Sequence, residues 1–188
     1  MAEPAEKEPE REPAPAPRKR RPATAREAKA LGHPLRLRIL RLCLTRELTN
    51  RELADRLDTN PGTVLHHVRT LVNAGLLTAA PVRTGSSGAL EKPYRATDES
   101  WWLDGPLQDL PPEERTAPIV ALTDELDEAG PEAVRTYARF ALHLNDEEVA
   151  ELDRRILAVL DEYVAGDDQR LDRPVHGGAF LLYRSPEA

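Results

Sequence analysis

The sequence contains very few cysteine and aromatic residues and no long apolar run. Cys43 is the only cysteine among 188 residues, which excludes an internal disulfide and a zinc site of several thiolates and fits a reducing compartment. Aromatic residues make up 4% of the chain, so the core must consist of aliphatic side chains, a composition that favours helices. No apolar run reaches the roughly 18 residues of a membrane span, and residues 1–12 lack the apolar core of a secretory signal. We therefore expect a cytoplasmic protein that does not enter the membrane.

Motifs of catalysis and metal binding are also missing. The sequence has no glycine-rich phosphate loop, no HExxH motif and no recognisable Ser/His/Asp arrangement. Beyond residue 100 the histidines are His143 and His176, and neither has a second histidine three or four residues away. The sequence therefore predicts no enzyme, no cofactor and no metal site.

Charge is distributed very unevenly along the chain. The net charge is −7, but residues 18–97 contain sixteen Lys/Arg against six Asp/Glu. Residues 101–188 contain eight Lys/Arg against twenty Asp/Glu. Such an asymmetry favours a basic segment that faces nucleic acid, joined to an acidic segment with another role. The alternative is a solvated surface on which charge is simply uneven.

Helix caps and apolar periodicity predict four helices after the N-terminal segment. Thr24 begins the first, Thr49 and Glu52 form a capping box for the third, and Asn60 caps the fourth, which ends before Gly75. The third and fourth helices, joined by a short turn with the second of them longer, form a helix-turn-helix pattern. The predicted helices span residues 25–31, 34–45, 50–57 and 61–73.

A wing is expected directly after the fourth helix. Residues 76–82 and 93–97 favour strands, and residues 83–89, rich in glycine and serine, favour a flexible hairpin tip. The predicted fold is mostly α with a small β-wing. Its winged helix-turn-helix domain spans residues 23–98.

The flanking segments differ from this domain in composition. Residues 1–22, rich in proline, alanine, glutamate and arginine, predict a disordered arm whose basic end either touches DNA or only keeps the chain in solution. Residues 99–188 predict an acidic, mainly helical region. Its helices are expected at 113–144, with a break near Gly130, and at 146–165, and a late strand at 177–184.

Four motifs of the predicted domain stand out: ALGHPLRLRIL at 30–40, ELADRL at 52–57, PGTVLHHVRTL at 61–71 and NAGLL at 73–77. In this order they resemble the arsenical-resistance-repressor (ArsR) family of winged helix regulators. The resemblance covers residues 24–97 and implies a homodimer that binds double-stranded DNA, with repression as the expected outcome. The thiol pair of the family's arsenic sensors is absent from residues 52–56, and the resemblance does not imply metal sensing here.

The fourth helix is expected to enter the major groove with the face opposite its apolar stripe. Thr63, His66 and Arg69 carry groups that can contact base edges, whereas Arg36 and Arg51 are candidates for phosphate contacts. We expect His67 to have a packing role. Asn60 is expected to cap the helix, to contact a phosphate, or to do both. The candidate DNA-binding residues are Asn60, Gly62, Thr63, Leu65, His66, Arg69, Arg83 and Lys92.

Two interpretations remain open for residues 99–188. Their helices either form the homodimer interface or close a pocket for an unidentified small-molecule effector, with Trp101, Trp102, Tyr137 and Phe140 as candidate walls or ordinary core. The whole chain is interpreted as a sequence-specific transcriptional regulator. The alternative is a winged helix module that binds proteins and not specific DNA, for which exposed apolar residues would be expected at 60–69.

Overall fold

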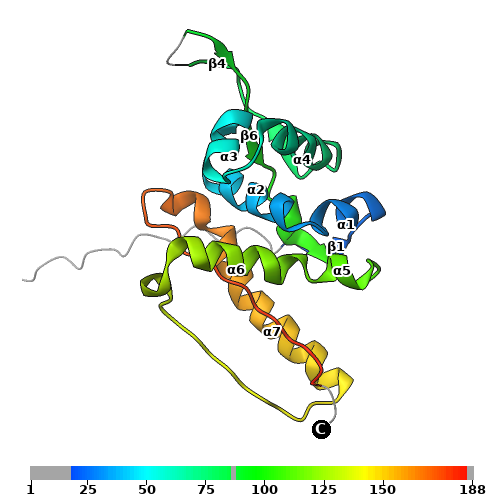
Figure 1. Ribbon diagram of the computed structural model, residues 1–188. Helices are drawn as coiled ribbons and strands as arrows, with labels where there is room; N and C mark the ends of the chain where they lie inside the picture. Colours follow the sequence, from blue (N-terminus) through cyan, green and yellow to red (C-terminus); the bar gives the residue numbers. More distant parts are fainter. Residues whose placement is uncertain (1–17, 86–87, 186–188) are drawn as a thin grey trace, which may run out of the picture.

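The computed structural model describes residues 18–85 and 88–185, in which helices dominate and the strands are short. Four helices form the N-terminal half, each within one residue of its predicted position (Figure 1). They are α1 (Ala25–Leu31), α2 (Pro34–Thr45), α3 (Asn50–Arg56) and α4 (Pro61–Asn73).

Side chains at the helix starts explain these boundaries. The Thr49 hydroxyl accepts from the Glu52 backbone N–H at 3.2 Å, and the Glu52 carboxylate accepts from the Thr49 N–H at 2.7 Å. Thr24 and Glu27 form the same reciprocal pair at α1. At the end of α4 the chain reverses at Gly75, whose φ of 73° is accessible to glycine at little cost. The local chemistry of the sequence thus determines where these helices begin and end.

A three-stranded antiparallel sheet closes the domain beside α4. Its strands lie in the order β2 (Leu48–Thr49), β6 (Pro93–Ala96) and β3 (Leu77–Ala79). The hairpin of β4 (Arg83–Thr84) and β5 (Leu90–Glu91) continues outward and projects away from the helices (Figure 1). The predicted wing is therefore present. Its strand pairing includes residues 83 and 84, which the sequence predicts to be part of the flexible hairpin tip.

The core of the domain is aliphatic, as the composition predicted. Ile39 of α2, Leu53 of α3 and Leu71 of α4 are fully buried and belong to one hydrophobic cluster. Cys43 lies in the same cluster, and burial raises the pKa of its thiol to about 12. A thiol protonated at neutral pH acts as a small apolar group and not as a nucleophile.

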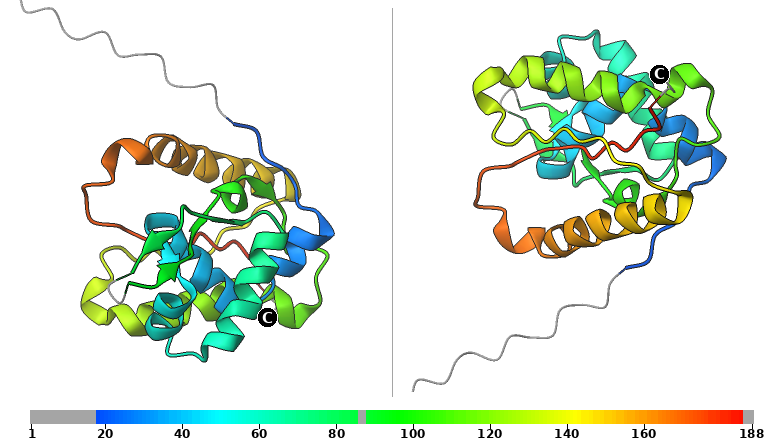
Figure 2. Two further views of the ribbon diagram at one scale, coloured as in Figure 1. Left: turned by 90° about the horizontal axis from the view of Figure 1, so that it is seen from above. Right: turned by 90° about the horizontal axis from the view of Figure 1, so that it is seen from below.

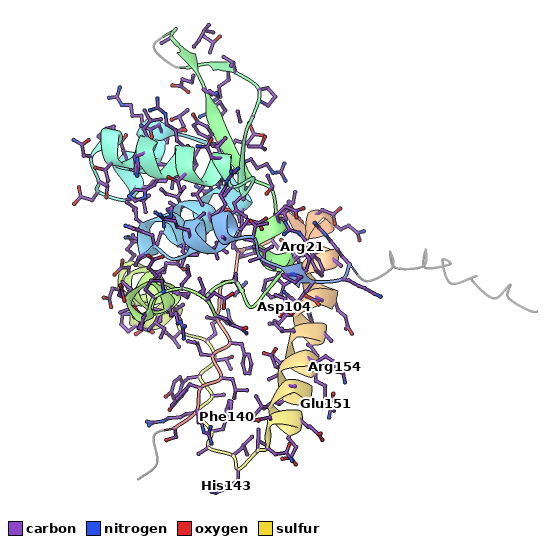
Figure 3. All side chains as sticks on the ribbon, turned by 90° about the vertical axis from the view of Figure 1, so that its right-hand side faces the viewer. Arg21, Asp104, Phe140, His143, Glu151 and Arg154 are labelled. Atoms are coloured by element: carbon purple, nitrogen blue, oxygen red, sulfur yellow. The ribbon has the colours of Figure 1, made fainter. Side chains whose placement is uncertain are left out.

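The last residues of the predicted arm are packed against the domain. β1 (Arg21–Pro22) pairs in parallel with β7 (Leu103–Asp104) (Figure 3). Arg21 donates to both carboxylate oxygens of buried Glu27, at 2.7 and 3.0 Å, and these bonds lower the pKa of Glu27 to about 2. The prediction that residues 1–22 form a disordered arm is therefore wrong for residues 18–22. Residues 1–17 lie outside the described part of the chain.

The acidic half begins with helices that cover α2. After η1 (Glu99–Trp102) the chain forms α5 (Pro112–Arg115) and α6 (Ala117–Ala129), and α6 packs against α2. Arg41 of α2 pairs with Glu125 of α6 at 2.8 Å. The basic and acidic halves are thus in direct contact through complementary charge.

The remaining residues differ in part from the sequence prediction. α7 (Asp146–Ala165) is the predicted long helix, capped by Asn145. The short 3-10 helix η2 (Pro131–Ala133) lies between α6 and α7 in the sequence, and a second one, η3 (Asp167–Arg170), follows α7. No described residue of this half forms a helix long and apolar enough to cross a membrane.

Two predicted elements are absent from the described residues. Residues 134–144 form no helix and residues 177–184 form no strand; both segments run as irregular chain (Figure 2). Tyr137 is 78% exposed and Phe140 49%, so this segment buries little apolar surface, and a helix without packing is marginal. A strand likewise requires a hydrogen-bonded neighbour, and no residue within 18–85 or 88–185 pairs with residues 177–184 as a strand.

Candidate nucleic-acid interface

Helix α4 has one buried and one exposed face. Val64, Val68 and Leu71 are fully buried, as their helical spacing predicted. The opposite side is open except for Leu65, which is half-buried. We call this side the α4 outer face; it comprises Gly62, Thr63, Leu65, His66 and Arg69. The five predicted contact residues of this helix therefore share one surface.

Asparagines position the start of α4. The Asn60 side chain accepts from the Gly62 N–H at 2.8 Å and so acts as the helix cap. Asn50 of α3 donates from its amide to the Pro61 carbonyl at 2.9 Å and joins the two helices. The sequence did not predict this role of Asn50. A polar residue at the first position of a helix does not indicate that its side chain bonds to a carbonyl eleven residues later. This bond orients α4 relative to α3.

The α4 outer face is polar and carries a positive charge. Thr63, His66 and Arg69 are all exposed. No ion pair within residues 18–85 and 88–185 involves Arg69, so its guanidinium is available to an external acceptor. A hydroxyl, an imidazole and a guanidinium on one exposed helix face are the donors that read base edges in a major groove.

His67 lies on the other side of the same helix. It is 7% exposed, and its ring centroid lies 4.5 Å from that of His33, the residue that caps α2. Burial, together with the nearby His33 and Arg36, lowers the pKa of His67 to about 4. His67 is therefore neutral at pH 7 and packs within the domain, as the sequence interpretation favoured.

The buried His67 predicts an acid-sensitive domain. Its folded-state pKa lies below the ordinary 6.5, so the unfolded chain takes up the proton first as the pH falls. The free energy of unfolding should therefore decrease by about 1–3 kcal/mol between pH 6.5 and pH 4. Urea unfolding of His67→Leu across this range should show a smaller decrease than the wild type, whereas His66→Gln should retain it. An unchanged pH dependence in His67→Leu would contradict the assignment.

The two predicted wing residues differ in their surroundings. Arg83 donates to both oxygens of Glu52 on α3, at 2.8 and 2.9 Å, and pairs with Glu91 at 3.3 Å. The ammonium of Lys92 lies 5.9 Å from the centre of the Tyr94 ring and remains exposed. Because exposed ion pairs contribute only about 0–1 kcal/mol, Arg83 can exchange its carboxylates for a phosphate at little cost.

The other two candidates for phosphate contacts, Arg51 and Arg36, also differ in their surroundings. Arg51 is exposed at the start of α3. Arg36 instead donates to the carbonyls of Ala30 and Lys29, each at 2.6 Å, and satisfies the end of α1. These bonds use Nε and Nη2 of Arg36, and a phosphate contact from its remaining donors stays a prediction.

The four candidate pocket residues do not come together. Trp102 is 8% exposed and Trp101 half-buried, and both lie in η1 beside the N-terminal segment. Tyr137 and Phe140 are exposed on the segment 134–144, where Phe140 is labelled in Figure 3. A pocket with all four as walls is not formed. Among the described residues, no group of three or more His, Cys, Asp or Glu side chains is placed to hold a metal ion.

The geometry defines a winged helix-turn-helix domain followed by a helical acidic region. Residues 33–79, from the cap of α2 to the end of β3, match the family model "Bacterial regulatory protein, arsR family". The match confirms the ArsR-like helix-turn-helix that the sequence motifs predicted for this part of the chain. It leaves the acidic half unassigned.

Comparisons over the whole chain add little detail. No curated protein matches it. Among four matching chains of known structure is the crystal structure of the transcriptional regulator SlyA. That likeness covers 72% of this chain and 77% of the SlyA chain, with 15% sequence identity and a TM-score of 0.29.

Proposed function

We propose that the protein is a sequence-specific, double-stranded DNA-binding transcriptional regulator that acts in the cytoplasm as a homodimer. The observation that carries this proposal is the α4 outer face. It is exposed and polar, has an unpaired arginine, and belongs to the helix-turn-helix that matches the arsR family model. Repression is the proposed outcome because it is what the ArsR resemblance implies.

The contacts divide by chemistry into base readers and phosphate binders. Thr63 and His66, near the start of α4, would contact base edges, where a hydroxyl or an imidazole distinguishes one base pair from another. Arg83 and Lys92 on the wing, together with Arg51, would contact phosphates and contribute affinity without sequence information. Asn60 would lie beside a phosphate at the N-terminus of α4 while it caps the helix.

Exposed apolar residues on α7 support the homodimer. Val159 is 55% exposed and Tyr163 65%, and they continue the stripe that Leu152 and Ile156 begin at helical spacing. Leu152 and Ile156 are half-buried, but the end of the stripe at Val159 and Tyr163 is open in the single chain, and large exposed apolar patches mark interaction sites. A second copy would cover it and would also place two α4 helices about 34 Å apart, one turn of DNA.

Titration of genomic duplex DNA at several salt concentrations tests the proposal. We expect submicromolar binding to some sequences, a steep decrease in affinity with salt, and two chains per bound duplex. His66→Ala should decrease affinity about 10-fold for the preferred sequence and relax its specificity. Arg83→Ala should weaken all sequences alike and lower the salt slope by about one.

A second outcome would favour the protein-binding alternative. If no duplex binds better than random DNA, and His66→Ala changes nothing, the α4 outer face does not read sequence. Leu65 is its only apolar residue and is half-buried, so the surface itself favours DNA over an apolar protein partner.

A further inference from the structure

The guanidinium of Arg20 lies in a site built from η1 and α7. It pairs with Asp161 at 2.6 Å and donates to the Trp101 carbonyl. Its central carbon lies 4.8 Å from the centre of the Trp101 ring and 5.7 Å from that of Trp102. We call Trp101, Trp102 and Asp161 the indole cradle. One carboxylate, one carbonyl and two indole rings are together what a planar organic cation requires.

One contact within the indole cradle does not depend on the cation. The Trp101 indole N–H donates to the same Asp161 oxygen at 2.8 Å, which holds the carboxylate beside the ring. Trp102 is 8% exposed, with the guanidinium groups of Arg18 and Arg20 at 5.5 and 5.7 Å from its ring centre. A site whose walls are held by their own contacts binds a ligand with little reorganisation.

Arg20 can leave the indole cradle while the backbone around it stays in place. Residues alternate sides along an extended segment, so Arg18 and Arg20 face the indoles while Arg21 points to Glu27. The pairing of β1 with β7 and the Arg21–Glu27 bonds hold the segment independently of Arg20. The backbone at Arg20 is thus anchored by contacts other than those of the Arg20 side chain.

We propose that the indole cradle is a binding site for a small guanidinium compound and that Arg20 occupies it in the free chain. The incoming guanidinium takes over the Asp161 carboxylate and the faces of both indoles. Arg20 then turns outward to solvent, beside the exposed Arg18 and Lys19. No covalent step is involved: one guanidinium replaces another beside Asp161, so the charge within the site is unchanged and the complex as a whole gains one positive charge.

The site also joins the two halves of the chain. Between α7 and residues 18–129, all described hydrogen bonds and ion pairs involve Asp161. Replacing Arg20 with a free ligand therefore removes the ion pair between the N-terminal segment and α7. Asp161 still has a guanidinium partner, which is now the ligand. A resulting change in DNA binding would rest on the proposed function, whereas ligand binding itself does not.

Tryptophan fluorescence measures occupancy of the site directly. The chain has two tryptophans, and both belong to the indole cradle. We would titrate the full-length protein with ethylguanidinium chloride at constant ionic strength and use ethylurea as the neutral isostere. The expected result is a saturable change with ethylguanidinium and none with ethylurea.

Variants separate this site from a general effect of the cation. Arg20→Ala removes the competing side chain and should tighten binding about 10-fold if the wild-type site is open about a tenth of the time. Asp161→Asn should weaken binding about 10-fold, because a charge-assisted bond is lost. Arg154→Ala, also on α7 but paired with Glu151, is the matched control and should bind as the wild type does (Figure 3).

Each remaining outcome would overturn the proposal. The absence of a saturable change in both the wild type and Arg20→Ala, or equal binding of ethylurea, would exclude a guanidinium site. Equal affinity in the wild type and Arg20→Ala would show that Arg20 does not occupy it. Because no DNA is present in these titrations, their failure is distinct from a failure of the proposed DNA binding.

Discussion

Replacement of Leu71 by alanine should lower the free energy of unfolding by about 2–5 kcal/mol. Leu71 is fully buried where α4 meets the core that includes Ile39 and Leu53. The substitution removes apolar surface from the core and leaves a cavity that surrounding helices fill only in part. Urea unfolding followed by far-ultraviolet circular dichroism measures the decrease directly.

Leu65→Ala is the matched control because it makes the same substitution six residues earlier in the same helix. Leu65 is half-buried on the α4 outer face, so its loss should cost no more than about 1 kcal/mol. The two variants should also differ in function. Leu65→Ala should weaken DNA binding while the domain remains stable, whereas Leu71→Ala should bind normally at temperatures where it is folded. Equal destabilisation by both would mean that the buried and exposed faces of α4 are wrongly assigned.

The helices of the N-terminal half were predictable because their signals are local. Thr49 and Glu52, three residues apart, identify the start of α3, and Asn60 with Pro61 identifies the start of α4. The buried and exposed faces of α4 follow from the 3.6-residue period alone. For this reason the candidate residues of the outer face fall on one surface.

Contacts between distant residues were not predictable in this way. Arg83 and Glu52 are 31 residues apart, and Arg20 and Asp161 are 141 apart. In the sequence each arginine is simply a surface cation, since an ion pair has no periodicity to reveal its partner. The ordering of residues 18–22 and the indole cradle therefore emerged only from the folded structure.

The acidic half shows why a pattern of apolar residues is not enough. Val149, Leu152 and Ile156 predicted α7 correctly, helped by the Asn145 cap. The apolar residues near Tyr137 suggested a helix as well, but Tyr137 and Phe140 remain exposed, and a helix without packing is marginal. Secondary structure there depends on what covers it, which sequence periodicity does not encode.

The sharpest test of the α4 outer face is a reversal of charge at Arg69. Arg69→Glu removes an exposed guanidinium and places a carboxylate where the proposed duplex carries phosphates. We expect affinity for the preferred duplex to fall about 100-fold near 0.1 M salt, since attraction is lost and repulsion is added. Stability should change little, because Arg69 is exposed and makes no described ion pair.

Arg154→Glu changes the net charge by the same amount at a distant surface. Arg154 lies on α7, opposite its apolar stripe, and its one ion pair within the described part of the chain is with Glu151 on the same helix (Figure 3). Its reversal should leave DNA affinity within about twofold of the wild type, because at about 0.1 M salt charges are screened beyond roughly 10 Å. If both reversals weaken binding equally, net charge and not the α4 outer face governs the association. A large loss confined to Arg69→Glu would instead place the duplex against α4, where the exposed hydroxyl, imidazole and guanidinium converge.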